Sequence, residues 1–182
     1  MQIAFIGYGK VGAPLADQLQ RLGHVVTLAA TEVVFLAIPF QSIQAALSPV
    51  MEQLRGKILV DCTNTVGPNL THGLNGTQSG AQVIQALVPE TRVVKAFNIY
   101  GFEDLENNVF PKYNVRPVMM YCGQDAAAKE SVGELITQLG WQALDVGGLE
   151  QALSLEFMTL LWVRMVRANG HSPDMAWAML SR

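Results

Sequence analysis

The chain has 182 residues and a net charge of −3; half of its residues are hydrophobic and 15% are charged. This composition excludes a disordered chain and predicts a single globular domain over residues 1–182. Lysine and arginine do not cluster, and no apolar run reaches the roughly 20 residues that a membrane span needs, so we expect neither a nucleic-acid nor a membrane partner. The N-terminus lacks the pattern of a signal peptide, so we expect a cytoplasmic protein.

A short strand followed by three spaced glycines begins the chain. Residues 3–6 form an apolar run without charge, which predicts a strand buried on both faces. Gly7, Gly9 and Gly12 follow with the spacing G-x-G-x-x-G. In dinucleotide-binding proteins the first glycine permits a tight turn, the second lets the backbone approach a pyrophosphate, and the third lets the next helix pack closely on the strand. The motif therefore predicts a dinucleotide site; the alternative is a glycine-rich turn without a ligand.

The helix after this loop is expected at residues 11–22 and should end at Gly23. Its free N–H groups and the positive end of its dipole would face a diphosphate. Lys10 lies within the loop. Its ammonium group could reach a phosphate, or it could be a solvated lysine at a helix start.

Strands and helices are expected to alternate along the rest of the chain. Further strands are predicted at residues 25–28, 33–38, 57–61, 92–95, 117–122 and 141–145. Helices are predicted at residues 41–54 with a bend at Pro49, 81–87, 126–139 with Asp125 as the cap, and 150–168. This alternation predicts an α/β fold with a Rossmann-like, doubly wound, mostly parallel sheet, and a C-terminal helical extension over residues 147–182.

Ligands of such sheets bind beyond the carboxyl ends of the strands. The residues to inspect therefore follow the predicted strands directly. They are the glycine loop, the segment Ile38-Pro39-Phe40, the segment Thr63-Asn64-Thr65 and the segment Ala96-Phe97-Asn98.

Five stretches of the chain resemble the deazaflavin (coenzyme F420)-dependent NADP oxidoreductase family, and they are also similar to the NADPH domain of six-transmembrane metalloreductases. The stretches are IGYGKVG from Ile6, VVFLAIP from Val33, KILVDCTN from Lys57, VVKAFN from Val93 and YCGQDAAAK from Tyr121. The fourth is the most specific of them. The resemblance implies a Rossmann-like fold and NADP as the cofactor, with a deazaflavin or flavin as a further redox co-substrate.

The resemblance also implies how the chain meets the nucleotide. The glycine loop would surround the pyrophosphate, and the residues after the strand at 33–38 would lie along the adenosine or ribose. Those after the strand at 57–61 would lie near the nicotinamide ribose, and those after the strand at 92–95 would flank the nicotinamide. The implied residues are Gly7, Tyr8, Gly9, Lys10, Val11, Gly12, Ile38, Pro39, Thr63, Asn64, Ala96, Phe97 and Asn98.

No catalytic side chain and no metal site are predicted. His24, His72 and His171 are scattered without the spacing of metal ligands. His72 lies in a polar loop and could approach the site, but we expect it to be solvated there. We interpret Glu150 and Glu156, at the start of the last long helix, as structural. Hydride transfer between a nicotinamide and a flavin-like ring needs mainly orientation and a dry pocket, whereas reduction of a carbonyl or imine usually needs a proton donor as well.

We therefore expect an NADP(H)-dependent oxidoreductase that transfers hydride between the nicotinamide and a deazaflavin or flavin. The alternatives are a non-catalytic redox-sensing module and a reductase of a small imine or keto substrate. Phe97, Tyr100 or Phe102 could pack against the acceptor, or they could belong to the core. The apolar face of the last helix could form a homodimer or could cover the sheet. Its residues are Met158, Leu161, Trp162 and Met165.

Residues 29–32 are unusual in two respects. An NAD-specific site usually has an acid after the second strand, but Ala29, Ala30 and Thr31 stand there, which favours NADP. Glu32 is assigned to the start of the next strand instead. Four residues are also too few to link two parallel neighbouring strands, and a tight hairpin would make the second strand antiparallel. We hypothesise that a segment, with the ligands of the 2′-phosphate, is missing between Ala30 and Thr31.

Two cysteines, Cys62 and Cys122, complete the residues of interest. Each ends a predicted strand. We expect two buried free thiols, with a disulfide bridge as the alternative.

Overall fold

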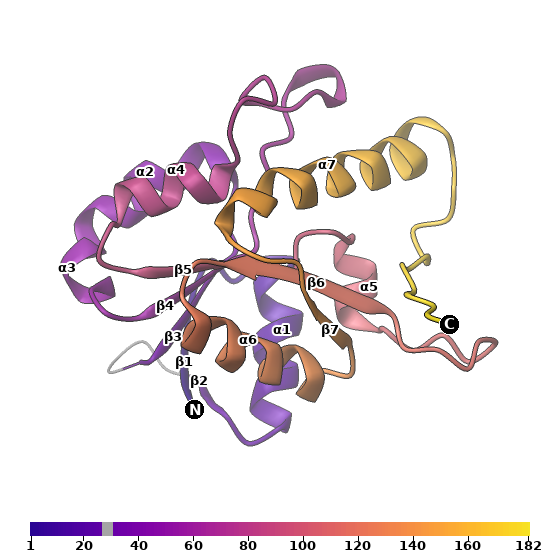
Figure 1. Cartoon of the computed structure of the whole chain (residues 1–182), viewed down its shortest axis with the longest axis horizontal. Helices are drawn as coiled ribbons and strands as arrows, with labels where there is room; N and C mark the ends of the chain where they lie inside the picture. Colours follow the sequence, from indigo (N-terminus) through magenta and orange to yellow (C-terminus); the bar gives the residue numbers. More distant parts are fainter. Residues whose placement is uncertain (27–30) are drawn as a thin grey trace.

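The computed structural model describes residues 1–26 and 31–182 (Figure 1). It contains a seven-stranded sheet with the order β2-β1-β3-β4-β5-β6-β7. The strands are β1 (Gln2–Ile6), β2 (Val25–Val26), β3 (Val33–Leu36), β4 (Ile58–Asp61), β5 (Arg92–Lys95), β6 (Val118–Gly123) and β7 (Gln142–Asp145). Strands β1 to β5 run parallel, β6 is antiparallel to β5, and β7 is parallel to β6. The predicted mostly parallel, Rossmann-like sheet is confirmed.

Helices cover both faces of this sheet. In Figure 1, α2, α4 and α7 lie above the sheet, whereas α1 and α6 lie below it. Helix α5 contacts α1, where Nε2 of Gln18 donates to the carbonyl of Leu105 at 2.6 Å. The α-helices are α1 (Gly12–Arg21), α2 (Ile43–Leu47), α3 (Met51–Leu54), α4 (Gly80–Leu87), α5 (Phe102–Glu106), α6 (Ala126–Gln138) and α7 (Ala152–Val163). No helix of the described ranges is both long and apolar enough to cross a bilayer.

The local signals behind the helices act as predicted, with small shifts of the ends. Gly23, at φ +86°, follows α1, and the side chain of Asp125 accepts a hydrogen bond of 2.8 Å from the backbone N–H of Ala128. Pro49 lies in a 3₁₀ turn that separates α2 from α3, so the predicted bent helix is two short ones. The short helix α5 was not predicted. After α7, one π-helical turn extends to Ala168, and the chain after it contains no helix.

The core lies between the sheet and its helices and is largely apolar. All four residues of β3 and of β4 are buried, as expected of central strands in a parallel sheet. Cys62 and Cys122 are free and buried, which confirms the prediction, and burial raises the pKa of both thiols. Trp162 is also buried, so α7 covers the sheet, although Leu161 on the same helix is 50% exposed.

The connection between β2 and β3 is where the sequence was hardest to interpret. Both strands pair with β1, one on each side, and both run parallel to it, so the tight hairpin is wrong. The backbone carbonyl of Glu32 accepts from the N–H of Ile58 at 3.0 Å, which places Glu32 at the amino end of β3 as assigned. The hypothesis of a missing segment concerns residues 27–30 and their junction with Thr31, which lies outside the described residues.

Candidate nucleotide-binding site

Two of the three loop glycines are required by the packing of the protein itself. Gly7 has φ +101°, a conformation that other residues rarely adopt, and a Cβ atom there would lie 2.4 Å from the carbonyl oxygen of Ala37. A Cβ atom on Gly12 would lie 2.2 Å from the carbonyl oxygen of Gly7. Gly7 therefore permits the turn after β1, and Gly12 permits the close approach of α1.

Gly9 differs because nothing in the described protein requires a glycine there. Its φ is not left-handed, and no heavy atom of residues 1–26 or 31–182 comes within 4 Å of a Cβ atom built on it. A residue without a side chain next to open space leaves the backbone accessible. This is the property that close contact with a pyrophosphate demands.

The side chains beside Gly9 are held by weak surface contacts. Tyr8 is 64% exposed, and its hydroxyl donates to Oδ1 of Asp17 at 2.9 Å, which raises the pKa of the phenol. The Nζ atom of Lys10 lies 4.7 Å from the centroid of the Phe102 ring. Such an exposed cation–π contact is worth only about 0.5–1 kcal/mol, so it leaves the ammonium group available to a phosphate.

Two further predicted segments meet at the carboxyl ends of β4 and β5. The Nδ2 atom of Asn64 donates to the carbonyl of Asn98 at 3.0 Å, and Nδ2 of Asn98 donates to Oδ1 of Asn64 at 3.1 Å. Directly before Asn98, Phe97 has φ +59°, a strained conformation for a bulky residue. Backbone strain of this kind persists where the surroundings fix it, and it clusters at functional sites.

Ile38 belongs to the same edge of the sheet. Its Cγ2 atom would lie 2.6 Å from a Cβ atom on Gly7, so the segment after β3 touches the glycine loop. Pro39 begins the 3₁₀ turn that leads into α2. The structure therefore places the predicted residues along the adjacent ends of four parallel strands.

Two buried polar atoms at this edge have no hydrogen-bond partner in the part of the chain that the structure describes. They are Oγ1 of Thr63 and Oδ1 of Asn98, in side chains that belong to residues 3% and 1% exposed. A hydroxyl can donate or accept, and an amide oxygen accepts. Unsatisfied buried polar atoms are rare, so these two mark the ends of β4 and β5 as unusual, but a ligand would have to displace their surroundings to reach them.

A buried ionic cluster, formed by Asp61, Lys95 and Glu156, lies directly beneath these segments. The Nζ atom of Lys95 lies 2.9 Å from Oδ2 of Asp61, 3.2 Å from Oε1 of Glu156 and 2.5 Å from the carbonyl oxygen of Thr63. Burial opposes the charge on Lys95, but Asp61 and Glu156 outweigh it and raise the pKa above its ordinary value. Burial likewise opposes ionisation of Glu156, yet Lys95 and hydrogen bonds lower its pKa. Lys95 and Glu156 are therefore both charged at neutral pH.

His72 extends this cluster, so the prediction of a solvated histidine is wrong. The residue is 8% exposed, and its Nε2 atom lies 3.0 Å from Oε2 of Glu156. Its Nδ1 atom accepts from the backbone N–H groups of Leu74 and Gly76, each at 3.2 Å. An imidazole nitrogen that accepts carries no proton, so these partners assign a neutral ring with its proton on Nε2. Within residues 1–26 and 31–182, no group of three His, Cys, Asp or Glu side chains could hold a metal ion.

The aromatic residues expected near an acceptor are mostly in the core. Phe97 is 1% exposed and packs 5.7 Å from Phe35, while Tyr100 is 6% exposed and packs 4.8 Å from Trp141, measured between ring centroids. For these two residues the core alternative is correct. Phe102 lies beneath Lys10.

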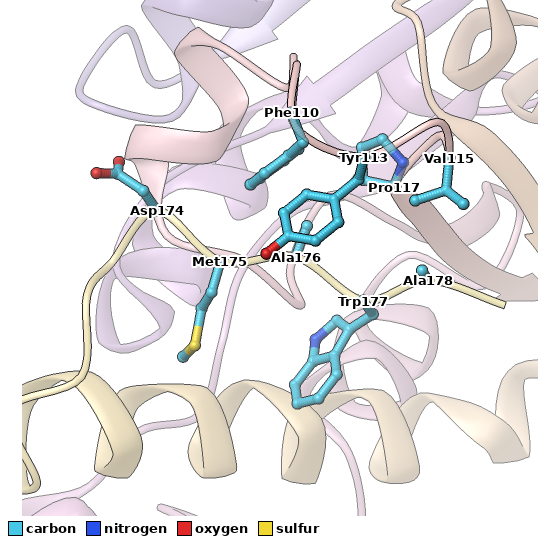
Figure 2. A pocket seen from close by; sticks show the side chains of 9 residues that line it. All are labelled: Phe110, Tyr113, Val115, Pro117, Asp174, Met175, Ala176, Trp177 and Ala178. Atoms are coloured by element: carbon cyan, nitrogen blue, oxygen red, sulfur yellow. The ribbon is translucent and has the colours of Figure 1, made fainter.

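Other aromatic side chains line a cavity of about 300 Å³ near the same edge (Figure 2). Because β6 is antiparallel, its first residue, Val118, lies past the carboxyl end of β5. The hydroxyl of Tyr100 donates to the carbonyl of Val118 and accepts from the backbone N–H of Trp177. These bonds hold the C-terminal segment against residues 110–117. The cavity between them is lined by Phe110, Tyr113, Val115, Pro117, Asp174, Met175, Ala176, Trp177 and Ala178.

A neighbouring hollow shares Phe110, Tyr113 and Asp174 with this cavity and includes Asp104. Asp104 is 2% exposed, and its Oδ2 atom has no partner among the described residues. Burial, reinforced by Asp174 and Glu103, raises the pKa of this carboxyl group to about 7. Asp104 can therefore hold a proton near neutral pH, which the sequence pattern did not indicate.

This chain is similar in sequence to an NADP oxidoreductase family and to proteins named as reductases. Residues 27–65 match the family described as NADP oxidoreductase, coenzyme F420-dependent. The metalloreductase STEAP3 of Rattus norvegicus is 36% identical over 129 residues, which make up 71% of this chain and 25% of that protein. The F420-dependent NADP reductase of Methanocaldococcus jannaschii is 31% identical over 141 residues, which make up 72% of this chain and 60% of that enzyme. The chain thus spans between a quarter and 60% of these two curated relatives.

A solved structure extends the similarity over the whole fold. The crystal structure of an Arthrobacter sp. FB24 protein, provisionally described as an F420-dependent NADP reductase, has a TM-score of 0.86 at 29% identity and covers 100% of both chains. The resemblance inferred from the five stretches is therefore confirmed in sequence and in fold.

The contrast between the glycines gives a first prediction. Gly9→Ala should fold normally, because its Cβ atom meets no protein atom, but its affinity for NADP⁺ should fall at least tenfold because the methyl group occupies the space of a pyrophosphate. Gly12→Ala should instead lose stability, because its Cβ atom would overlap the carbonyl of Gly7. Thermal unfolding and titration calorimetry separate the two effects. An unchanged dissociation constant for Gly9→Ala would contradict the assignment of this loop.

The buried cluster gives a second prediction. Glu156→Gln removes one counter-charge of a fully buried ammonium group and should lower the free energy of unfolding by about 3 kcal/mol at pH 7. The lowered pKa of Glu156 contributes stability above its unfolded value of about 4.3, and this contribution is lost as the pH falls through the folded-state pKa. Urea unfolding between pH 3 and pH 7 should therefore show the two proteins converging in acid.

The exposed Glu134 on α6 provides the control for this experiment. Glu134→Gln should leave the stability of the protein within about 0.5 kcal/mol of the wild type at every pH. A constant difference between Glu156→Gln and the wild type down to pH 3 would show that the charge of Glu156 is not what stabilises the fold.

Proposed function

We propose that this chain, which resembles the F420-dependent NADP oxidoreductases in sequence and fold, transfers hydride between NADP(H) and a deazaflavin or flavin. The observation that carries the proposal is Gly9. The packing of the described protein does not require a glycine there, but close approach of a pyrophosphate to the backbone does. The names of the relatives support NADP as the nucleotide and F420 as a co-substrate. Bound NADP(H) would supply the hydride chemistry itself.

The residues of the chain then bind and orient the nucleotide. Gly7 to Gly12 and the amino end of α1 hold the pyrophosphate, with Lys10 free to leave the Phe102 ring for a phosphate. Ile38 and Pro39 lie along the adenosine or ribose. The segments Thr63-Asn64 and Ala96-Phe97-Asn98 flank the nicotinamide half; Oγ1 of Thr63 and Oδ1 of Asn98 could bind it only if the nucleotide displaces the atoms that bury them.

We place the second redox partner in the aromatic cavity of Figure 2. Tyr113 is 66% exposed, and together with Phe110 it offers ring faces on which a planar ring system can stack. The cavity has the minimum size of typical small-molecule sites and includes Pro117, next to the first residue of β6, past the carboxyl end of β5. Hydride transfer between two such rings depends on their relative orientation, which the side chains lining the cavity would fix.

A second candidate, reduction of a small imine or keto substrate, is favoured by one observation. Asp104 lies beside the cavity with a pKa of about 7 and could give a proton to the reduced substrate. Because its Oδ2 atom is fully buried, a substrate would first have to displace its surroundings. We therefore rank this activity below transfer between two rings.

Turnover with defined acceptors tests the proposal. NADPH is mixed with the deazaflavin, FMN, FAD or a cyclic imine, and the loss of reduced-nicotinamide absorbance is followed. We expect oxidation with a ring acceptor, and a catalytic efficiency with NADPH at least tenfold above that with NADH. Tight binding of the nucleotide without any turnover would instead indicate a non-catalytic redox-sensing module. Comparable efficiency with NADH would contradict the assignment of NADP.

The cavity is tested separately from the nucleotide site. Tyr113→Ala removes a stacking surface and should raise the KM for the ring acceptor about threefold to tenfold, because an aromatic pair is worth about 0.5–1.5 kcal/mol. The KM for NADPH should stay within twofold of the wild type. Tyr113→Phe keeps the ring and serves as the matched control. An increase in the KM for NADPH alone would place the nucleotide, and not the acceptor, in this cavity.

A further inference from the structure

Helix α7 reaches the nucleotide edge of the sheet through two residues one turn apart, Glu156 and Thr159. We propose that these residues, together with Lys95, are positioning residues: they fix the two segments that form the floor of the nicotinamide half of the site. The inference rests on the proposed function, since it concerns how tightly the nucleotide is held. It gives α7 a role beyond covering the sheet.

The first step runs through Lys95 to Thr63. The ammonium of Lys95 donates to the carbonyl of Thr63 at 2.5 Å, and Oδ1 of Asp61 accepts from the backbone N–H of Thr63 at 2.9 Å. Both backbone groups of Thr63 are thus held by charged side chains. Hydrogen bonds to charged groups are stronger than those between neutral ones, so the conformation of this segment depends on the charge of Lys95.

The second step runs through Thr159 to Asn98. The hydroxyl of Thr159 donates to the carbonyl oxygen of Asn98 at 2.7 Å, and it accepts from Nδ2 of Asn98 at 3.1 Å. Asn98 is thereby held from one side by α7 and from the other by Asn64. Phe97, in its strained left-handed conformation, lies in the sequence between Lys95 and Asn98, and the side chains of both of these residues are held by hydrogen bonds. Strain is maintained only where neighbours fix the backbone, and Thr159 and Lys95 provide that restraint.

Glu156 connects these contacts of Lys95 and Thr159 to another helix on the same face of the sheet, α4. Its Oε1 atom accepts from the N–H of Gly80 at the start of α4 at 2.8 Å, and its Oε2 atom accepts from Oγ1 of Thr65 at 2.6 Å. One carboxylate therefore links α7 to α4, to Lys95 and to the segment after β4. A buried ion pair is seldom the most stabilising way to fill a core, which favours a role in geometry over one in stability alone.

The test uses Thr159→Val, which has nearly the same shape but lacks the hydroxyl, with Thr159→Ser as the conservative variant. We expect Thr159→Val to raise the dissociation constant for NADP⁺ about fivefold, since it removes hydrogen bonds worth about 0.5–1.5 kcal/mol each. Thr159→Ser keeps the hydroxyl and should therefore bind NADP⁺ with wild-type affinity. Hydrogen exchange of residues 93–102 should accelerate in Thr159→Val before any nucleotide is added.

Thr91→Val is the matched control. Thr91 is as buried as Thr159, 4% exposed in each case, and its hydroxyl also donates to a backbone carbonyl, that of Leu54. It lies at the amino end of β5, away from the site, so its loss should lower the melting temperature without changing the affinity for NADP⁺. Equal weakening of binding by Thr91→Val and Thr159→Val would overturn the positioning role, because general destabilisation would then explain both.

Lys95→Met gives an independent reading of the first step. We expect it to weaken NADP⁺ binding more than Thr159→Val does; wild-type affinity in the folded variant would overturn the role of Lys95. If it does not fold, the comparison of Thr159→Val with Thr91→Val decides the inference. The two levels of failure are distinct. A wild-type protein that does not bind NADP⁺ overturns the proposed function, whereas a wild-type protein that binds while Thr159→Val binds equally well overturns only the positioning role.

Discussion

The burial of one positive charge, on Lys95, constrains the arrangement of the carboxyl edge of the sheet. An ammonium group without counter-charges in a fully buried position would cost several kcal/mol. The β4–β5 register sets Asp61 opposite Lys95 and so supplies one carboxylate, and α7 supplies the other in Glu156. The charge can therefore be accommodated only when the two central strands are in register and the C-terminal helix lies across them. Sheet, helix and strand-end segments form one unit for this reason.

The features that could be predicted from the sequence are those with a local physical cause. The apolar runs of the strands, the cap at Asp125, the break at Pro49 and the glycine loop all depend on residues within a few positions of one another, and the structure contains each of them. Within the described residues, the ends of the strands moved by at most two residues because strand pairing, not composition, decides where a strand stops. Helix α5, only five residues long, carries too weak a periodicity to be detected.

The environment of the site could not be predicted because it depends on contacts across long stretches of chain. His72 and Glu156 are 84 positions apart, and nothing in the surroundings of either residue indicates that they are partners. The loop composition around His72 suggested solvent, but the tertiary fold buries it. The aromatic cavity likewise forms between residues 110–117 and the C-terminal segment. Tyr100 is a core residue because its ring packs against Trp141, which is distant in the sequence. The candidate nucleotide residues were easier to locate, since topology alone places the ends of parallel strands at one edge.

The left-handed backbone of Phe97 has a consequence for the range of residues that this position can accept. The backbone favours glycine or asparagine, which tolerate a positive φ, whereas β-branched residues are excluded there. The ring, however, packs against Phe35 in the core, so a small residue would leave a void. These two demands point in opposite directions, and few side chains satisfy both. A position under such a double restriction ties its residue type to the backbone conformation that the fold imposes there.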